Sequence, residues 1–210
     1  GHMHGRFASD AAVRNLNGAY LSGVFEDDVA EINRAITSAN RQVFDRARHE
    51  GATIGTTVAV LYATGQRACC LWVGDSRIYR YRDGVLEQLT RDHTQVRHLP
   101  ETNQITEAEA EHHPMGHVLT RAVGVDASVR IDVRQVDIAP EDIFLICSDG
   151  LTACANEAEI RDVVSEYGAS RACARLVEIC LDRGAPDNVS IITVACDEVT
   201  AVETTLPESV

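Results

Sequence analysis

Apolar residues recur at a helical spacing in the first quarter of the chain. Within residues 26–50 they lie three or four positions apart, which is the spacing of a helix that buries one stripe. The stripe consists of Val29, Ile32, Ile36, Ala39, Val43 and Ala47. Gly51 comes directly after the end of this predicted helix. A preceding helix is predicted over residues 7–21, although Gly18 weakens its end.

After Gly51 the pattern changes to the short period of strands. Four runs rich in β-branched and aromatic residues are separated by glycine turns, and such runs predict an antiparallel meander. These predicted strands are residues 53–63, 68–73, 77–81 and 85–89. Three later strands are predicted at residues 129–138, 142–147 and 189–195.

Helix signals return in the second half of the chain. Asn156 and Glu159 form a capping box, which opens a predicted helix that Gly168 closes. Ser170 caps a second helix, which ends near Gly184. Runs of strands interleaved with helix pairs predict the α+β class, with antiparallel sheets covered by helices.

The chain is predicted to form one domain, because no repeat or linker divides it. Residues 91–117 form a long polar segment rich in histidine, with a short helix predicted at a capping box over residues 106–109. Residues 1–3 look like the remnant of a cleaved tag, residues 4–196 form the domain, and residues 197–210 are expected to be a flexible tail.

Composition excludes several classes of protein. The chain has 210 residues and a net charge of -13, which disfavours nucleic acid and anionic membrane surfaces as partners. No apolar run approaches the roughly 20 residues that span a bilayer, and no signal peptide is recognisable, so a cytoplasmic setting is expected. The seven cysteines lack a Cys-x-x-Cys pair and are expected to be reduced, buried small hydrophobes.

Two acidic turns carry the chemistry. Asp149 comes after an apolar strand, and Asp187 precedes another. Two aspartates carried by strands into one cleft would form a site of hard oxygen ligands, which Mg²⁺ or Mn²⁺ accepts. The pattern therefore indicates metal-assisted phosphate chemistry. Taken alone, however, each aspartate is also a common turn former.

Six short motifs occur in order around these aspartates. They are Gly55-Thr56-Thr57, Val73-Gly74-Asp75-Ser76-Arg77, Leu89-Thr90-Arg91-Asp92-His93, Leu119-Thr120-Arg121-Ala122-Val123-Gly124, Ser148-Asp149-Gly150-Leu151 and Pro186-Asp187-Asn188-Val189. Together they resemble the metal-dependent protein serine/threonine phosphatases of the PPM (type 2C) family, bacterial branch. The resemblance implies a four-layer αββα sandwich, in which two antiparallel sheets flanked by helices hold two metal ions at one end.

The resemblance also implies roles for individual residues. Asp149 and Asp187 match the family's metal ligands, and Asp92 resembles a carboxylate that shares a third, weaker metal with Asp149. Asp75 resembles a position that supports the site from behind the ligands, with Asn188 and Gly150 beside it. The implied cofactor is Mn²⁺ or Mg²⁺. No catalytic side chain is implied beyond a metal-activated water, which attacks the phosphorus without a phosphoenzyme.

Two other kinds of site are weighed against this one. His93, His112, His113 and His117 suggest zinc, but their spacing fits no compact motif and solvated loop histidines are favoured. Cys147 precedes the Ser148 turn, yet it lies in an apolar strand without a partnered base, which indicates packing rather than a nucleophile.

The sequence departs from the family at its start. The family begins with two strands and an Asp-Gly-Met-Gly-Gly motif, and the segment around His4-Gly5 resembles the stretch just after that motif. We therefore expect the sandwich to lack its first strands, the metal-bridging aspartate and the arginine that grips phosphate. Weak metal binding and little activity are expected for this polypeptide, as is a homodimer through the sheet edges left open.

Three functions are compatible with the resemblance. The leading one is a protein serine/threonine phosphatase domain in an N-terminally shortened form, with phosphoproteins as substrates and a Ser/Thr kinase or its targets among them. The main alternative is a catalytically inactive pseudophosphatase that binds a phosphoprotein or kinase. A phosphatase of an anti-sigma antagonist is a third candidate, which the long segment 91–117 fits less well.

Overall fold

A computed structural model of the chain describes residues 2–95 and 118–197. The predicted short helix at 106–109, the histidines His112, His113 and His117, and the predicted tail beyond residue 197 lie outside these residues. In chain order the elements are α1 (His2–Asn17), α2 (Phe25–Glu50), β1 (Val58–Thr64), β2 (Arg67–Val73), β3 (Arg77–Arg82), β4 (Val85–Gln88), β5 (Asp132–Asp137), β6 (Ile143–Cys147), α4 (Asp149–Thr152), α5 (Glu157–Asp182) and β7 (Ile191–Ala195).

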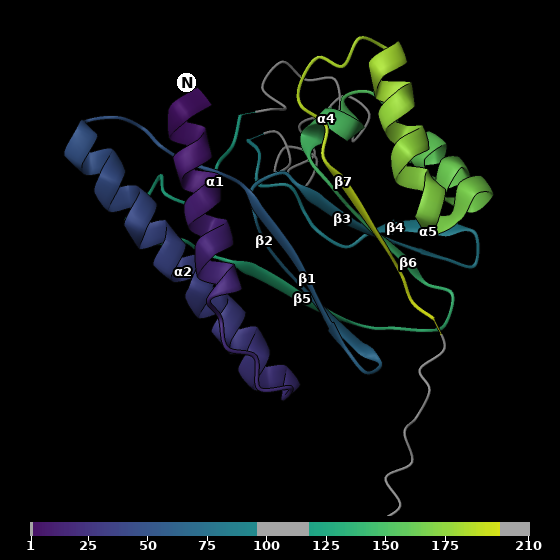
Figure 1. Cartoon of the computed structure of the whole chain (residues 1–210), viewed down its shortest axis with the longest axis horizontal. Coiled ribbons are helices and arrows are strands. Elements are labelled where there is room, and N and C mark those ends of the chain that lie inside the picture. Colours follow the sequence, from purple (N-terminus) through teal and green to yellow (C-terminus); the bar gives the residue numbers. More distant parts are fainter. Residues whose placement is uncertain (1, 96–117, 198–210) are drawn as a thin grey trace, which may run out of the picture.

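Two antiparallel sheets lie between two layers of helices (Figure 1). One sheet has the order β1-β2-β5 and is covered by α1 and α2, and the other has the order β4-β3-β6-β7 and is covered by α5. This arrangement confirms the predicted α+β class and its two helix-flanked antiparallel sheets.

Strand β2 is buried on both faces, because it lies between a helix layer and the second sheet. Cys69 and Leu71 pack with the α1–α2 pair, whereas Cys70 and Trp72 pack with side chains of the second sheet. Successive side chains of a strand point to opposite faces, so both sets must be apolar. The continuous run Ala68-Cys69-Cys70-Leu71-Trp72-Val73 is therefore a consequence of the layered architecture.

The predicted stripe of α2 is the face that packs on the first sheet. Ile32, Ile36 and Ala39 are buried against β1 and β2. The two isoleucine side chains each stabilise the fold by roughly 1.5–3 kcal/mol on burial. Gly51 ends the helix with a φ of 62°, and backbone N–H groups of the cap donate to the carbonyls of Ala47 and Arg48. A left-handed glycine is a common way to end a helix.

The predicted meander of four strands is wrong. β1 pairs with β2, and β3 pairs with β4, but β2 and β3 belong to different sheets. Gly74 makes the crossing with a φ of 114°, and a Cβ on it would lie only 2.4 Å from Cγ2 of Thr57. A hairpin turn and a corner between sheets both use glycine in this way, so the local pattern could not distinguish them.

The last two helices are predicted more accurately. Both hydrogen bonds of the capping box between Asn156 and Glu159 are present. Gly168 has non-helical angles, φ 61° and ψ 176°, which divide α5 at the predicted position. Helix α4 is not predicted, because four residues are too few to show a helical period.

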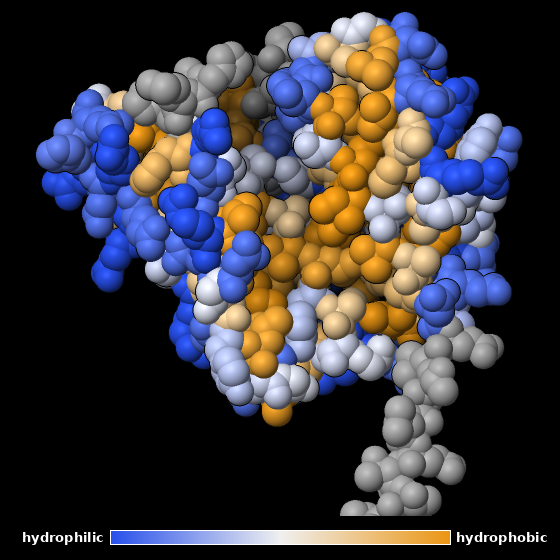
Figure 2. Space-filling view, viewed as in Figure 1, coloured by the Kyte–Doolittle hydropathy of each residue, from blue (hydrophilic) through white to orange (hydrophobic). Residues whose placement is uncertain are grey.

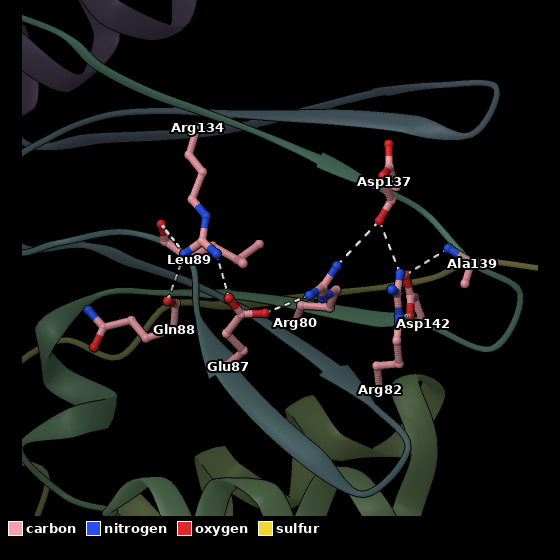
Figure 3. Close-up of polar contacts among 9 residues, drawn as sticks. All are labelled: Arg80, Arg82, Glu87, Gln88, Leu89, Arg134, Asp137, Ala139 and Asp142. Carbon is pink, nitrogen blue, oxygen red and sulfur yellow. Dashed lines mark hydrogen bonds and ion pairs between the residues drawn. The ribbon is translucent and has the colours of Figure 1, made fainter.

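Arginine side chains connect the two sheets (Figure 3). Arg134 of β5 donates to Glu87 on the other sheet at 2.5 Å, and Arg80 donates to the second oxygen of Glu87 at 2.6 Å. Arg82 binds both oxygens of Asp142, at 2.6 and 2.5 Å, and also reaches the carbonyl of Asp137 at 3.0 Å. The charged groups that make these contacts are therefore paired.

No helix within residues 2–95 and 118–197 combines the length and the apolar character that crossing a bilayer requires.

Candidate functional site

Asp149 stands at the junction of β6 and α4. β6 ends at Cys147, Ser148 has the extended angles φ -77° and ψ 166° of a residue that precedes a helix, and Asp149 is the first residue of α4. This junction leaves the carboxylate half-buried, at the carboxyl end of a central strand.

The two acidic turns are in direct contact, although they lie far apart in the sequence. The N–H of Ser148 donates to the carbonyl of Ser190 at 3.0 Å, and the N–H of Ser190 donates back to the hydroxyl of Ser148 at 3.0 Å. Gly150 packs so closely that a Cβ on it would lie 2.3 Å from the carbonyl oxygen of Asn188. Asp187 is exposed, and its Oδ1 accepts the N–H of Asn188 at 2.7 Å.

Asp75 is the third acidic group of this region. It lies in the crossing between β2 and β3, directly after Gly74, and is half-buried. Burial raises the pKa of Asp75 to about 6, and the negative charges of Asp149 and Asp92 contribute to the rise. The structure therefore brings Asp75 within electrostatic reach of Asp149, and its predicted supporting role stays a prediction.

Asp92 lies in an ion pair. Nε of Arg77 is 3.1 and 3.0 Å from its two oxygens, and Nη2 of Arg77 is 2.7 Å from Oδ2. Gln88 adds a hydrogen bond of 3.1 Å to Oδ1. Arg77 also donates to the Tyr79 hydroxyl at 3.0 Å. The predicted role of Asp92 as a metal ligand stays a prediction, and its carboxylate is already neutralised by a guanidinium.

His93 contacts the crossing between β2 and β3. Its buried ring accepts the N–H of Gly74 on Nδ1 at 3.0 Å, so Nε2 carries the proton and faces Asp132 at 3.2 Å. Burial lowers the pKa of His93, which favours the neutral ring. Arg121 binds the other oxygen of Asp132 at 2.8 Å. The sequence did not predict this hydrogen-bond network, although His93 and Arg121 both lie within the six motifs.

Cys147 is buried and belongs to the core. Burial raises the pKa of its thiol to about 12, which keeps it protonated at neutral pH. It packs with Tyr79, Leu145 and residues of α5. Its assignment to packing is consistent with this environment.

The acidic groups of the region do not form a complete metal site within the described residues. Within residues 2–95 and 118–197, no group of three or more His, Cys, Asp or Glu side chains is arranged to hold an ion. Asp75, Asp149 and Asp187 nevertheless have no ion-pair partner in that part of the chain, whereas the neighbouring arginine is paired with Asp92. Carboxylate oxygens without a cationic partner are the kind of donor that Mg²⁺ or Mn²⁺ accepts.

Two antiparallel sheets between helix layers, with aspartates gathered where strands end, form the arrangement expected of the phosphatases that the motifs resemble. Comparison with known proteins agrees. Residues 2–190 match the family model described as protein phosphatase 2C. The chain therefore belongs to the protein phosphatase 2C family of protein serine/threonine phosphatases. The match and helix α1 both begin at residue 2, within the segment 1–3 predicted to be a tag remnant.

Individual relatives cover most of the chain. It is 31% identical to the serine/threonine phosphatase stp of Listeria welshimeri over 92% of this chain and 80% of that protein. A structure of PppA, a key regulatory component of T6SS in Pseudomonas aeruginosa, is 36% identical over 93% of this chain and 81% of that chain, with a TM-score of 0.84. The catalytic domain of the phosphatase PstP in complex with two manganese ions is 26% identical over 94% of this chain and 82% of that chain, with a TM-score of 0.80.

Proposed function

We propose that this domain hydrolyses phosphoserine and phosphothreonine in proteins with the help of Mn²⁺ or Mg²⁺. The observation that carries the proposal is the contact between the Asp149 and Asp187 turns, whose carboxylates have no cation partner within residues 2–95 and 118–197. A manganese-containing structure among the similar proteins supports the choice of metal.

The residues of this chain would hold the ions and set their spacing. Asp149 and Asp187 would supply carboxylate oxygens from the two turns, and the contact between Gly150 and Asn188 would set the distance between them. Asp75 is better placed than Asp92 to join Asp149, because Asp92 would first have to release Arg77. When bound, such ions lower the pKa of a water and neutralise charge on the transferring phosphoryl group.

The 210-residue polypeptide is expected to bind the ions weakly. Two divalent ions bring four positive charges, and Asp149, Asp187 and Asp75 together supply at most three negative ones. No group of three ligating side chains is preformed in the described ranges 2–95 and 118–197. We therefore propose that metal binding is loose and hydrolysis slow for this polypeptide.

The test is Mn²⁺ titration by calorimetry together with hydrolysis of p-nitrophenyl phosphate and a phosphothreonine peptide. We expect weak Mn²⁺ binding and slow hydrolysis that Asp149→Asn abolishes and that the exposed-turn control Asp83→Asn retains. Absence of any Mn²⁺ binding would contradict the metal assignment. Rapid hydrolysis would contradict the proposed weak binding while supporting the activity.

The scarcity of ligands also favours the alternative, a pseudophosphatase that binds phosphoproteins without chemistry. Retained binding of the phosphothreonine peptide, with no hydrolysis at saturating Mn²⁺, would select this alternative. A kinase or its targets remain the proposed partners, and the cytoplasm the proposed location. The similar protein PppA is described as regulatory, which supports a signalling role.

The predicted homodimer would form through the open sheet edges. β7 ends the four-stranded sheet, and Ile192 and Val194 on it are 57% and 37% exposed. Apolar side chains gather in a band over the strands, between the α1–α2 pair and α5 (Figure 2). An exposed apolar edge is a template for pairing with another chain. Sedimentation velocity tests this, and a monomer at high concentration would contradict it.

A further inference from the structure

The crossing between β2 and β3 is held on both sides of Asp75. On one side the buried His93 bonds both backbone polar groups of Gly74. The N–H of Gly74 donates to Nδ1 of His93 at 3.0 Å, and the N–H of His93 donates to the carbonyl of Gly74 at 2.9 Å. On the other side the hydroxyls of Thr57 and Ser76 are 2.9 Å apart. Asp75 is therefore the residue between two anchored neighbours.

The crossing brings Asp75 to the same end of the sheet as Asp149. Arg77 pairs with Cys147 in the antiparallel ladder of β3 and β6. Asp75 lies two residues before Arg77, and Asp149 lies two residues after Cys147. In an antiparallel pair these two positions extend beyond the same end of the ladder. A contact that fixes Gly74 therefore also fixes where Asp75 starts relative to Asp149.

Asp132 determines which ring nitrogen of His93 accepts a hydrogen bond. A backbone N–H can only donate, so Nδ1 is unprotonated and the proton of the neutral ring lies on Nε2. Nε2 faces Oδ2 of Asp132 at 3.2 Å, and a carboxylate accepts that proton's hydrogen bond. Arg121 donates to Oδ1 of Asp132 at 2.8 Å, which favours the ionised carboxylate. The ring also stacks on Trp72, with the ring centroids 6.1 Å apart.

We propose that His93 and Asp132 position Asp75 for cation binding. Asp132 keeps the ring of His93 in the tautomer that accepts the N–H of Gly74, and this bond holds the Asp75 carboxylate where it can join Asp149. In the serine-protease triad, replacing the aspartate behind the histidine by asparagine likewise keeps the geometry but gives the wrong tautomer. His93 is a positioning residue here, because it contacts the backbone before Asp75 and not the cation.

The cation-binding part of this proposal rests on the proposed function, whereas the tautomer and the hydrogen bond do not. The first test is therefore nitrogen NMR of the 210-residue protein without metal. We expect His93 to carry its proton on Nε2 and to show a coupling across the hydrogen bond from Nδ1 to the amide nitrogen of Gly74. Loss of signals in His93→Asn identifies this ring among the eight histidines.

The variant Asp132→Asn tests the origin of the tautomer. An asparagine amide can donate to Nε2, so the ring should shift toward the form protonated on Nδ1, and the coupling to Gly74 should weaken or disappear. Asp137→Asn makes the same change in an exposed side chain at the far end of β5 and should keep both signals. Unchanged signals in Asp132→Asn would overturn the role of Asp132.

Two variants of His93 separate its two side-chain contacts. Asparagine supplies an acceptor about as far from the backbone as Nδ1, and glutamine supplies a donor about as far as Nε2. In a calorimetric Mn²⁺ titration His93→Gln should lose affinity about tenfold or more, as expected when a supporting group is removed, whereas His93→Asn should stay close to the parent. Both variants lose the buried ring, so their melting temperatures should fall alike. A role in packing alone would lower both melting temperatures and leave the Mn²⁺ affinities equal.

The outcomes distinguish this proposal from the proposed function. A parent protein protonated on Nδ1, or without the coupling to Gly74, would overturn the assigned hydrogen bond whether or not metal binds. If the parent binds Mn²⁺ and both His93 variants bind it equally well, the positioning role is overturned while the proposed function stands. A parent that binds no Mn²⁺ would overturn the cation-binding part together with the proposed function. If a His93 variant does not fold, Asp132→Asn, which keeps the ring, replaces it in the titration and should bind Mn²⁺ more weakly than Asp137→Asn.

Discussion

The aspartates at the two ends of strand β6 differ in whether a cationic side chain pairs with them. Asp142, just before the strand, is fully buried and accepts hydrogen bonds from Arg82 and from the N–H of Ala139. Asp149, just after the strand, has no ion-pair partner within residues 2–95 and 118–197 and lies near Asp75. One end of the strand thus holds a carboxylate that a guanidinium neutralises, and the other holds carboxylates without an ion-pair partner in the described residues 2–95 and 118–197.

The pKa values of Asp142 and Asp75 shift in opposite directions. Burial alone would raise the pKa of Asp142, but the hydrogen bonds from Arg82 and Ala139 lower it overall. Asp75 has no comparable partner, and burial with the nearby charge of Asp149 raises its pKa to about 6. Carboxylates that are costly to ionise in the folded state are frequent at functional sites.

The largest expected effect is a loss of Mn²⁺ affinity on substitution at the Asp149 end of β6. Asp149→Asn should lower Mn²⁺ affinity about tenfold or more, since it removes a charged ligand, and removing even a supporting group costs ~10–100-fold. Its stability should change little. Asp83→Asn makes the same charge change in an exposed turn and should leave affinity unchanged. Calorimetric titration with Mn²⁺ measures both, and equal affinities in the two variants would remove the contrast.

Substitution at the Asp142 end of β6 should instead change the stability of the protein. Asp142→Asn is expected to lower the free energy of unfolding by about 2–3 kcal/mol, because it leaves the guanidinium of Arg82 without its carboxylate. Urea unfolding followed by circular dichroism measures this. Asp137→Asn is the control, since Arg82 uses only the backbone carbonyl of Asp137. A loss below about 0.5 kcal/mol would place Asp142 among ordinary surface groups.

Contact between the two acidic turns can be broken without changing a charge. Gly150→Ala would place a Cβ at 2.3 Å from the carbonyl oxygen of Asn188 and should cost about 1–3 kcal/mol. Metal affinity should fall as the turns separate. Gly5→Ala, in helix α1 with nothing within 4 Å of its Cβ, should be neutral or slightly stabilising. Thermal unfolding compares the two, and a Gly150→Ala protein as stable as the parent would show that the turns can separate freely.

The smallest expected effect concerns the free-energy cost of ionising Asp75 in the folded protein. Its raised pKa means that the folded protein holds a proton more tightly than the unfolded chain. Stability from this group is therefore full below pH ~4 and is lost as the pH rises through about 6. Asp75→Asn should add about 1 kcal/mol at pH 7 after solvent screening, and nothing at pH ~4. Unfolding measured at both pH values checks this, and an equal gain at each would assign the effect to packing.

Much of the fold is set by local patterns. The stripe of α2, the capping box at Asn156 and the break at Gly168 were all predictable, because each depends on neighbours within a few residues. The Asp149 and Asp187 turns were recognised for the same reason. The division between sheets at Gly74 could not be predicted, since a glycine turn has the same local signature in a hairpin and in a sheet corner.

The sequence by itself determined the helices, most strands, the acidic turns and, through the order of its motifs, the phosphatase family. These features depend on periodicity, on capping and on residue types that a single stretch of chain contains. Only the tertiary structure decided that Arg77 pairs with Asp92 and that Asp75 lies beside Asp149. Charge pairing depends on distances between segments that are remote in the chain, and a pattern along the chain contains no information about those distances.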